Sequence, residues 1–173
     1  MKKSFSHCFL ILVVVVLSSC SGKKTANEVQ IEEGFVEING CEIYYKTIGE
    51  GEPIVFVHGG PGMSHDYFLP QMSELADDFK LIFYDQRASG RSSREVDSNT
   101  VSISGFIEDI EGIRQAFGYE KINLLGHSWG GIVAMNYAIR HSDKLASLML
   151  VSSNPASSYY GGSINKIAKT RLT

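Results

Sequence analysis

The chain has 173 residues, of which 43% are hydrophobic and 20% charged, and its formal net charge is -3. This length and hydrophobic content allow one domain with a substantial core, and they exclude a disordered chain. No run of basic residues interleaves with aromatic ones, so the composition does not support nucleic-acid binding. It favours a peptide or a small molecule as the partner.

The first residues have the pattern of an export signal. Lys2 and Lys3 give a positively charged start, and a short apolar run over residues 8–17 follows. Such a run is too short for a comfortable transmembrane span but has the length of the apolar part of a signal peptide. We therefore expect residues 1–19 to be a signal peptide.

The end of this run indicates lipidation. Its last residues, Leu17-Ser18-Ser19-Cys20, resemble the lipobox of bacterial lipoproteins, in which the signal is cleaved before a cysteine that is then acylated. Residues 20–32 would then be a polar tether, and the exported protein would be anchored at Cys20 on the periplasmic or surface side of a bacterial membrane. The alternatives are an uncleaved anchor and an ordinary secretory signal.

After cleavage and acylation, Cys41 is the one free cysteine of the mature chain. We expect it to be a buried structural thiol.

The folded domain, predicted over residues 33–153, opens with a hairpin. Residues 34–38 and 42–47 alternate apolar and polar side chains around Asn39-Gly40, the dipeptide preferred in two-residue turns. Continuous apolar runs then predict buried strands at residues 54–57, 81–84, 122–125 and 148–151. Helical spacing predicts helices over residues 102–117 and 129–140. Strands that alternate with helices indicate an α/β fold with a mostly parallel sheet.

A serine lies between two glycines where the third of these strands meets a helix. The stretch is Gly126-His127-Ser128-Trp129-Gly130-Gly131. A sharp strand-to-helix turn exposes a serine hydroxyl beside a base, and only residues without bulk relieve the crowding that such a turn causes. The pattern therefore predicts that Ser128 is a nucleophile.

A glycine-rich loop follows the strand at residues 54–57. In His58-Gly59-Gly60-Pro61-Gly62 the glycines let backbone amides point outward into a site. Attack by Ser128 on a carbonyl would create an oxyanion, for which the fixed donors would be the amides of Gly60 and Trp129.

These two motifs and a third resemble the signature stretches of prolyl iminopeptidases, which are serine aminopeptidases with the α/β-hydrolase fold. The third motif covers residues 85–92, Asp85-Gln86-Arg87-Ala88-Ser89-Gly90-Arg91-Ser92, and residues 63–67 are also similar to the family. The resemblance extends over residues 33–153. Ala88 is a departure, since the family commonly has glycine or cysteine there, but it is a small residue.

The resemblance implies that Ser128 is the nucleophile, with Gly60 and Trp129 as the oxyanion hole. It also implies a catalytic acid and a histidine on loops after a helical cap, in the order nucleophile, acid, histidine. Residues 154–173 would be only the start of that cap, so we expect the acid and the histidine to be absent from this chain. As written, the polypeptide is expected to be a truncated, inactive form.

None of the histidines in the predicted domain is a good general base. The ring of His127 should face away from the Ser128 hydroxyl, because adjacent residues at a strand end project in opposite directions. His58 and His65 are expected near the mouth of the site in structural or substrate-contact roles. His141 should stabilise the negative end of the helix that precedes it.

Asp85 follows a predicted strand, but it precedes Ser128, whereas the family order places the acid after the nucleophile. With Arg87 and Arg91 nearby, a structural ion pair is expected.

The histidines are dispersed, and neither an H-x-x-x-H nor a C-x-x-C spacing occurs, so the sequence predicts no metal site. It also implies no cofactor.

Three functions remain open. The first is a lipid-anchored serine aminopeptidase that releases N-terminal residues, often proline, through an acyl-enzyme on Ser128. The second is an esterase or another hydrolase of the same fold. The third is a noncatalytic, membrane-tethered fragment or binding domain.

Overall fold

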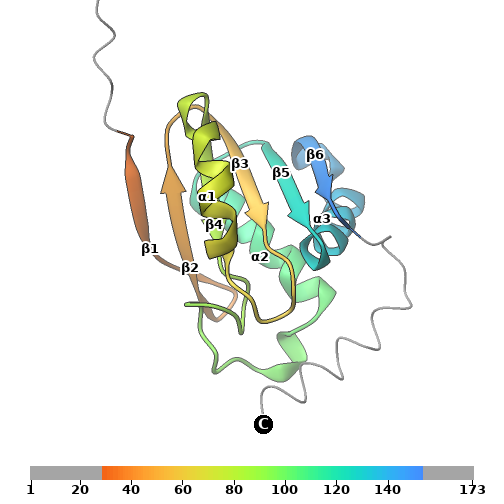
Figure 1. Ribbon diagram of the computed structural model, residues 1–173. Helices are drawn as coiled ribbons and strands as arrows, with labels where there is room; N and C mark the ends of the chain where they lie inside the picture. The colour runs from red at the N-terminus through yellow and green to blue at the C-terminus, as the bar shows by residue number, and fades with distance from the viewer. Residues whose placement is uncertain (1–28, 154–173) are drawn as a thin grey trace, which may run out of the picture.

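The computed structural model describes residues 29–153 (Figure 1). The predicted signal peptide, Cys20, most of the tether and the predicted cap segment 154–173 lie outside these residues. Among the helices of residues 29–153, none has both the length and the apolar character that crossing a membrane requires.

The predicted hairpin is confirmed. Strands β1 (Ile31–Ile38) and β2 (Cys41–Ile48) pair antiparallel, with Ile38 opposite Cys41. The two residues between them, Asn39 and Gly40, have φ values of 50° and 74°. A two-residue turn of type I′ needs a left-handed backbone at both positions, which asparagine and glycine adopt most readily.

The expected burial of residues 148–151 is wrong, because Leu150 and Val151 are 44% and 40% exposed on an edge strand of the described sheet. All four predicted apolar runs are nevertheless strands, and each strand extends beyond its run. They are β3 (Glu52–Val57), β4 (Phe79–Tyr84), β5 (Ile122–His127) and β6 (Leu145–Val151). The sheet order is β1-β2-β4-β3-β5-β6, with parallel pairing from β4 through β6. Since parallel strands end at the same edge, the loops after β3, β4 and β5 meet there. These loops carry the three signature motifs.

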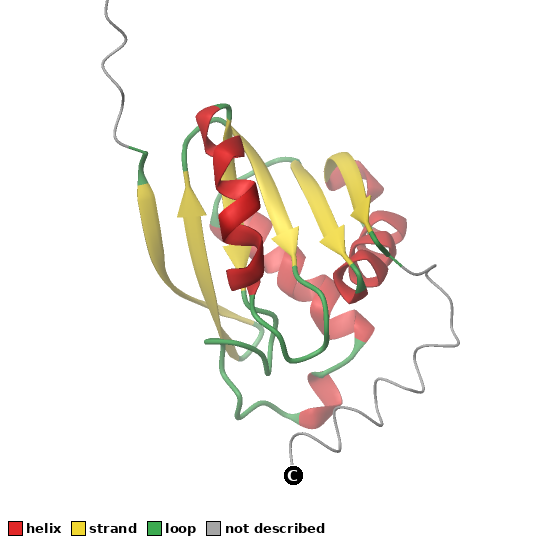
Figure 2. Ribbon diagram, in the orientation of Figure 1, coloured by secondary structure: helices red, strands yellow, loops and turns green. Residues whose placement is uncertain are grey.

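Helices cover both faces of the sheet (Figure 2). Helices α2 (Ile103–Ala116) and α3 (Trp129–Arg140) lie behind the sheet in Figure 1, and both were predicted. In front lies a helical segment made of η1 (His65–Phe68), α1 (Leu69–Met72) and η2 (Ser73–Asp77). Two short turns, η3 (Ser98–Thr100) and η4 (Ser142–Lys144), complete the helical elements of the described chain.

The front segment was not predicted, although its spacing contains a signal. Phe68 and Ala76 are buried against the front face, and Leu69 and Met72 pack beside them. These apolar positions recur at helical intervals. The segment supplies one of the two layers that cover the sheet.

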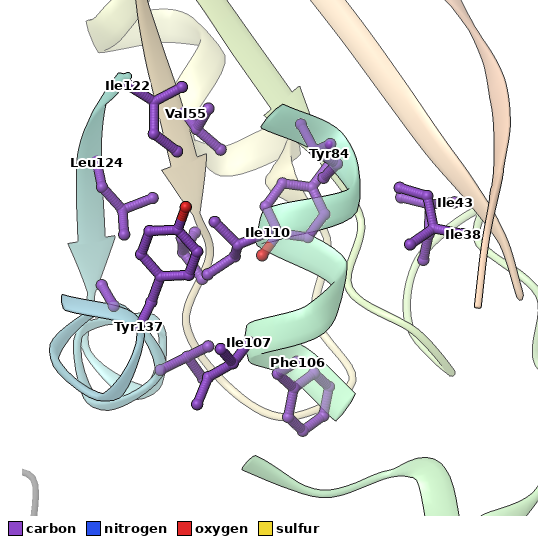
Figure 3. Packing of buried hydrophobic residues seen from close by; sticks show 14 of the residues in the cluster. Ile38, Ile43, Val55, Tyr84, Phe106, Ile107, Ile110, Ile122, Leu124 and Tyr137 are labelled. Carbon is purple, nitrogen blue, oxygen red and sulfur yellow. The ribbon is translucent and has the colours of Figure 1, made fainter. Parts of the chain in front are cut away.

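The larger core lies between the sheet and helices α2 and α3. Ile110, Tyr84 and Tyr137 are fully buried there, with side chains of both helices packed on those of the strands (Figure 3). Burying a large apolar side chain stabilises a fold by about 1.5–3 kcal/mol. Ser102 caps α2 by accepting a hydrogen bond from the Gly105 amide at 3.2 Å. The core therefore fixes the strand ends on which the site is built.

Candidate active site

Ser128 lies where β5 turns directly into α3. Its φ is 53° and its ψ is -118°, a backbone conformation that residues with a side chain rarely adopt. The Ser128 amide donates to the Val151 carbonyl at 2.9 Å, and the Ser128 carbonyl accepts from the Gly131 amide at 3.0 Å. The predicted sharp turn is therefore present, and neighbouring backbone holds it in this strained form.

The glycines around Ser128 are sterically required. A Cβ atom on Gly126 would lie 2.7 Å from the Gly131 Cα atom, and one on Gly130 would lie 2.1 Å from the Val57 carbonyl oxygen. These neighbours are backbone atoms, which cannot move without shifting a strand or helix. The glycines let the start of α3 pack closely on the ends of β3 and β5.

The structure brings the glycine loop against Ser128. A Cβ atom on Gly59 would lie 3.2 Å from the Ser128 Cβ atom, and Gly60 has a left-handed backbone with φ 82°. Within the described chain, no hydrogen bond from the amide of Gly60 or Trp129 is found. The two expected oxyanion donors thus come from adjoining backbone segments and are not committed to other described residues.

His58 orients the peptide group that carries the Gly60 amide. The His58 Nε2 atom accepts from the Gln86 amide at 3.0 Å, so the ring proton lies on Nδ1, which is 2.9 Å from the Gly59 carbonyl oxygen. In a trans peptide the carbonyl and the following N–H point in opposite directions. Holding the Gly59 carbonyl against His58 therefore aims the Gly60 N–H away from that ring.

Gln86 connects all three motifs. Its side-chain amide donates to the His58 carbonyl at 2.6 Å, and its Oε1 atom accepts from the Trp129 indole N–H at 3.1 Å. Burial lowers the pKa of His58 below its usual value and outweighs the opposing hydrogen bond to Gly59. His58 is thus a neutral, structural part of the site, and it is fully buried rather than in contact with solvent.

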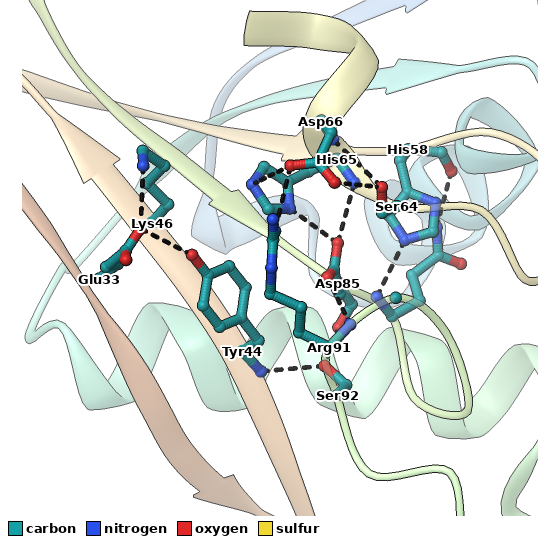
Figure 4. Close-up of polar contacts among 12 residues, drawn as sticks. Glu33, Tyr44, Lys46, His58, Ser64, His65, Asp66, Asp85, Arg91 and Ser92 are labelled. Atoms are coloured by element: carbon teal, nitrogen blue, oxygen red, sulfur yellow. Dashed lines mark hydrogen bonds and ion pairs between the residues drawn. The ribbon is translucent and has the colours of Figure 1, made fainter.

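Asp85 is buried beneath the loop after β4. It accepts hydrogen bonds from His65 Nδ1 at 2.7 Å, from the His65 amide at 2.9 Å and from the Arg91 amide at 2.8 Å (Figure 4). Burial raises the pKa of Asp85, but these three bonds outweigh it, and the pKa lies below its usual value. Since His65 is also fully buried, its role is structural.

The predicted ion pair of Asp85 with Arg87 and Arg91 is wrong. Arg87 pairs with Asp109 on α2, and the guanidinium of Arg91 pairs with Asp66. The Asp85 carboxylate points into the protein, where a backbone amide and an imidazole can reach it. The two longer guanidinium side chains extend away from it to partners on other elements.

His127 is engaged with a side chain that the sequence did not single out for the site. Its Nδ1 atom lies 2.8 Å from the hydroxyl oxygen of Tyr67, which comes from η1 on the front face.

His141 ends α3, with its ring stacked on Tyr137 at a centroid separation of 4.9 Å. Cys41 is buried, as expected, and burial raises the pKa of its thiol.

Sequence reasoning missed Tyr67 and Gln86 as parts of the site and gave His65 no partner. All three lie in or beside stretches that resemble the family, which was the available signal.

A shallow depression of about 460 Å³ adjoins the glycine loop. It is lined by Gly62, Met63, Ser64, Asp66, Tyr67, Gly90 and Arg94. Over residues 29–153, no cluster of histidine, cysteine or carboxylate side chains is arranged to hold a metal ion.

Comparison with known proteins extends these observations. The model of the family described as "alpha/beta hydrolase fold" matches residues 52–165. A proline iminopeptidase of Saccharolobus solfataricus is 41% identical over 129 residues, which cover 72% of this chain and 41% of that protein. One of Lactobacillus helveticus is 35% identical over 147 residues, which cover 81% of this chain and 50% of that protein. The chain thus spans half or less of the length of these relatives.

Solved structures show the same likeness. A proline iminopeptidase-related protein of Thermus thermophilus superposes with a TM-score of 0.67 at 28% identity, over 72% of this chain and 45% of that one. The epoxide hydrolase CorEH superposes with a TM-score of 0.67 at 30% identity, over 73% of this chain and 44% of that one.

Proposed function

The chain belongs to the alpha/beta hydrolase fold family, and on this premise we propose that it carries the nucleophile and the oxyanion hole of a serine aminopeptidase of the proline iminopeptidase type. The observation that supports this most directly is the contact between the glycine loop and Ser128. The similarity to proline iminopeptidases supports the substrate class, peptides with a free N-terminal residue that is often proline.

In this proposal the Ser128 Oγ atom attacks the carbonyl carbon of the first peptide residue. The negative charge on the carbonyl oxygen is stabilised by the amides of Gly60 and Trp129, and losing one such donor typically costs about 10²–10³-fold in rate. The peptide C–N bond then breaks, the amine leaves with a proton, and the acyl group stays on Ser128. Water hydrolyses this ester and restores the serine.

The general base of this reaction comes, in this proposal, from outside residues 29–153. His58 has both ring nitrogens in hydrogen bonds, His127 is bonded to Tyr67, and His65 is buried against Asp85. Loss of the triad partners of a serine nucleophile removes about 10⁴-fold or more of the rate. We therefore propose that the 173-residue chain alone turns over substrate very slowly.

Labelling the purified full chain with a fluorophosphonate tests the nucleophile. We expect slow labelling, mapped by mass spectrometry to Ser128 and abolished in Ser128→Ala. Labelling that persists in Ser128→Ala would refute Ser128 as the nucleophile. Labelling as fast as that of an intact serine hydrolase would contradict the proposed low reactivity.

A second assay separates the peptidase from an esterase, an alternative that stays open because the fold carries hydrolases of different specificity, of which the similar epoxide hydrolase is one. Any hydrolysis that depends on Ser128 is expected to favour prolyl amides over simple acetate esters. Turnover of the esters alone would overturn the peptidase assignment.

We also propose that Cys20 anchors the protein to a bacterial membrane, on the strength of the sequence pattern at residues 17–20. In cells fed a labelled fatty acid, the protein is expected to take up label and sediment with membranes. Cys20→Ala should lose the label, because the acylated thiol is gone, whereas Cys8→Ala should keep it. Equal labelling of the Cys20→Ala variant would rule out this anchor.

A further inference from the structure

Tyr67 joins the glycine loop to the residue that precedes the nucleophile. Its hydroxyl oxygen accepts a hydrogen bond from the Gly59 amide at 2.6 Å and lies 2.8 Å from His127 Nδ1. If the hydroxyl proton goes to Nδ1, the amide proton and the hydroxyl proton are both used. In that case Nδ1 is an acceptor, and the ring proton of a neutral His127 lies on Nε2.

Gly59 has little free space around it. A Cβ atom on it would lie 3.1 Å from His127 Nδ1 and 3.2 Å from the Ser128 Cβ atom. The peptide group between His58 and Gly59 is held at its N–H by Tyr67. The peptide group between Gly59 and Gly60 is held at its carbonyl by His58, and it carries the Gly60 N–H. The Tyr67 hydroxyl therefore holds the peptide group next to the one that carries the Gly60 amide, and a displacement of Gly59 would move both.

The bridge also connects two adjacent layers of the protein, the front helical segment and the sheet. Tyr67 comes from the front helical segment, whereas His127 ends β5 and immediately precedes the elbow. The Tyr67 ring packs on Phe68 with a centroid separation of 4.5 Å and on His127 with one of 5.4 Å. The ring has its own packing contacts, so the hydroxyl can be removed while the ring stays in place.

We propose that Tyr67 is a positioning residue of the oxyanion hole. Its hydroxyl holds the Gly59 peptide group and ties it to His127, so that the Gly60 donor and the Ser128 elbow keep a fixed separation. This inference rests on the proposed function, in which the Gly60 amide stabilises the oxyanion.

The variant Tyr67→Phe removes the hydroxyl and keeps the ring. Phosphonylation of Ser128 places an oxygen in the oxyanion hole, so its first-order rate constant is expected to fall about tenfold in this variant, because small displacements of catalytic groups are costly. The fluorophosphonate concentration that gives half of the maximal rate constant should stay unchanged. Tyr45→Phe is the matched control, because among residues 29–153 the Tyr45 hydroxyl bonds only to Glu32, at 3.0 Å on an exposed surface. An unchanged rate constant in Tyr67→Phe would overturn the positioning role.

Nuclear magnetic resonance tests the bridge without any reaction. In the wild-type chain the ¹⁵N shifts of His127 should report a proton on Nε2 and an acceptor at Nδ1. In Tyr67→Phe we expect hydrogen exchange of the Gly59 amide to become at least about tenfold faster and His127 to lose its single tautomer, because the hydroxyl that bonds both groups is removed. The amides of β3 should be unaffected.

These readouts separate the two proposals. If wild-type Ser128 does not react, the nucleophile assignment fails, but the exchange and tautomer measurements still decide the role of Tyr67. If Tyr67→Phe does not fold, the wild-type tautomer decides alone, and a proton on His127 Nδ1 overturns the inference.

Discussion

Replacing Ser128 with glycine is expected to stabilise the protein while it removes all reaction with a fluorophosphonate. The backbone of Ser128 has φ 53° and ψ -118°. A residue with a side chain stores about 1–3 kcal/mol in such a conformation, whereas glycine adopts it readily. Glycine also loses more chain entropy on folding, about 0.4–1 kcal/mol. The net gain in the free energy of unfolding should be about 1 kcal/mol by urea denaturation.

Ser128→Ala is the control for this experiment. It removes the same hydroxyl and the same reactivity, but it keeps the Cβ atom and therefore the backbone strain. Its free energy of unfolding should stay near that of the wild-type chain. Equal stabilities of the glycine and alanine variants would show that the turn stores no strain, whatever the outcome of the labelling.

Asp109→Ala is expected to destabilise the protein by about 3–5 kcal/mol, the usual cost of leaving one member of a buried ion pair without its partner. Arg87 reaches Asp109 through two hydrogen bonds, at 2.7 and 2.5 Å, and their side chains are only 3% and 1% exposed. The bond to Asp109 holds the pKa of Arg87 above its usual range. An arginine stays protonated even without its partner, so the guanidinium would remain charged and buried in Asp109→Ala. Urea denaturation measures the loss.

The preceding residue on α2 provides a matched control. Glu108 pairs with Arg140 at 3.2 Å, with side chains 46% and 44% exposed, respectively. Since exposed pairs contribute only about 0–1 kcal/mol, Glu108→Ala should have little effect. The double variant Arg87→Met with Asp109→Leu should recover most of the stability that Asp109→Ala loses, because it leaves no buried charge. A loss in Asp109→Ala no larger than in Glu108→Ala would contradict this account.

The strands, the two long helices and the hairpin follow directly from the sequence. Residues 54–57 and 81–84 form continuous apolar runs because their strands are buried on both faces, and α2 has a clear apolar stripe with a serine cap. These signals are local, so they are readable along the chain. The turn at Asn39-Gly40 has the same character.

The partners of polar side chains were harder to predict. Asp85 has arginines two and six positions later in the sequence, yet its partner is His65 from the front helical segment. The Tyr67 hydroxyl meets His127 only because the front helical segment packs over the end of β5. Such contacts depend on how separate elements pack, and residue spacing does not encode them. The front segment itself was missed because it is broken into three short helical pieces.

The network around Gln86 also has a consequence for the way the chain folds. Gln86 lies 28 residues after His58 and 43 residues before Trp129. The hairpin of β1 and β2 closes through two adjacent residues, but this network needs two long loops to be closed, and their entropy is lost before the contacts form. No short fragment can assemble the site. Ser128 and the glycine loop therefore reach their relative positions only after β3, β4 and β5 have come together, so the geometry around Ser128 is tied to the completion of folding.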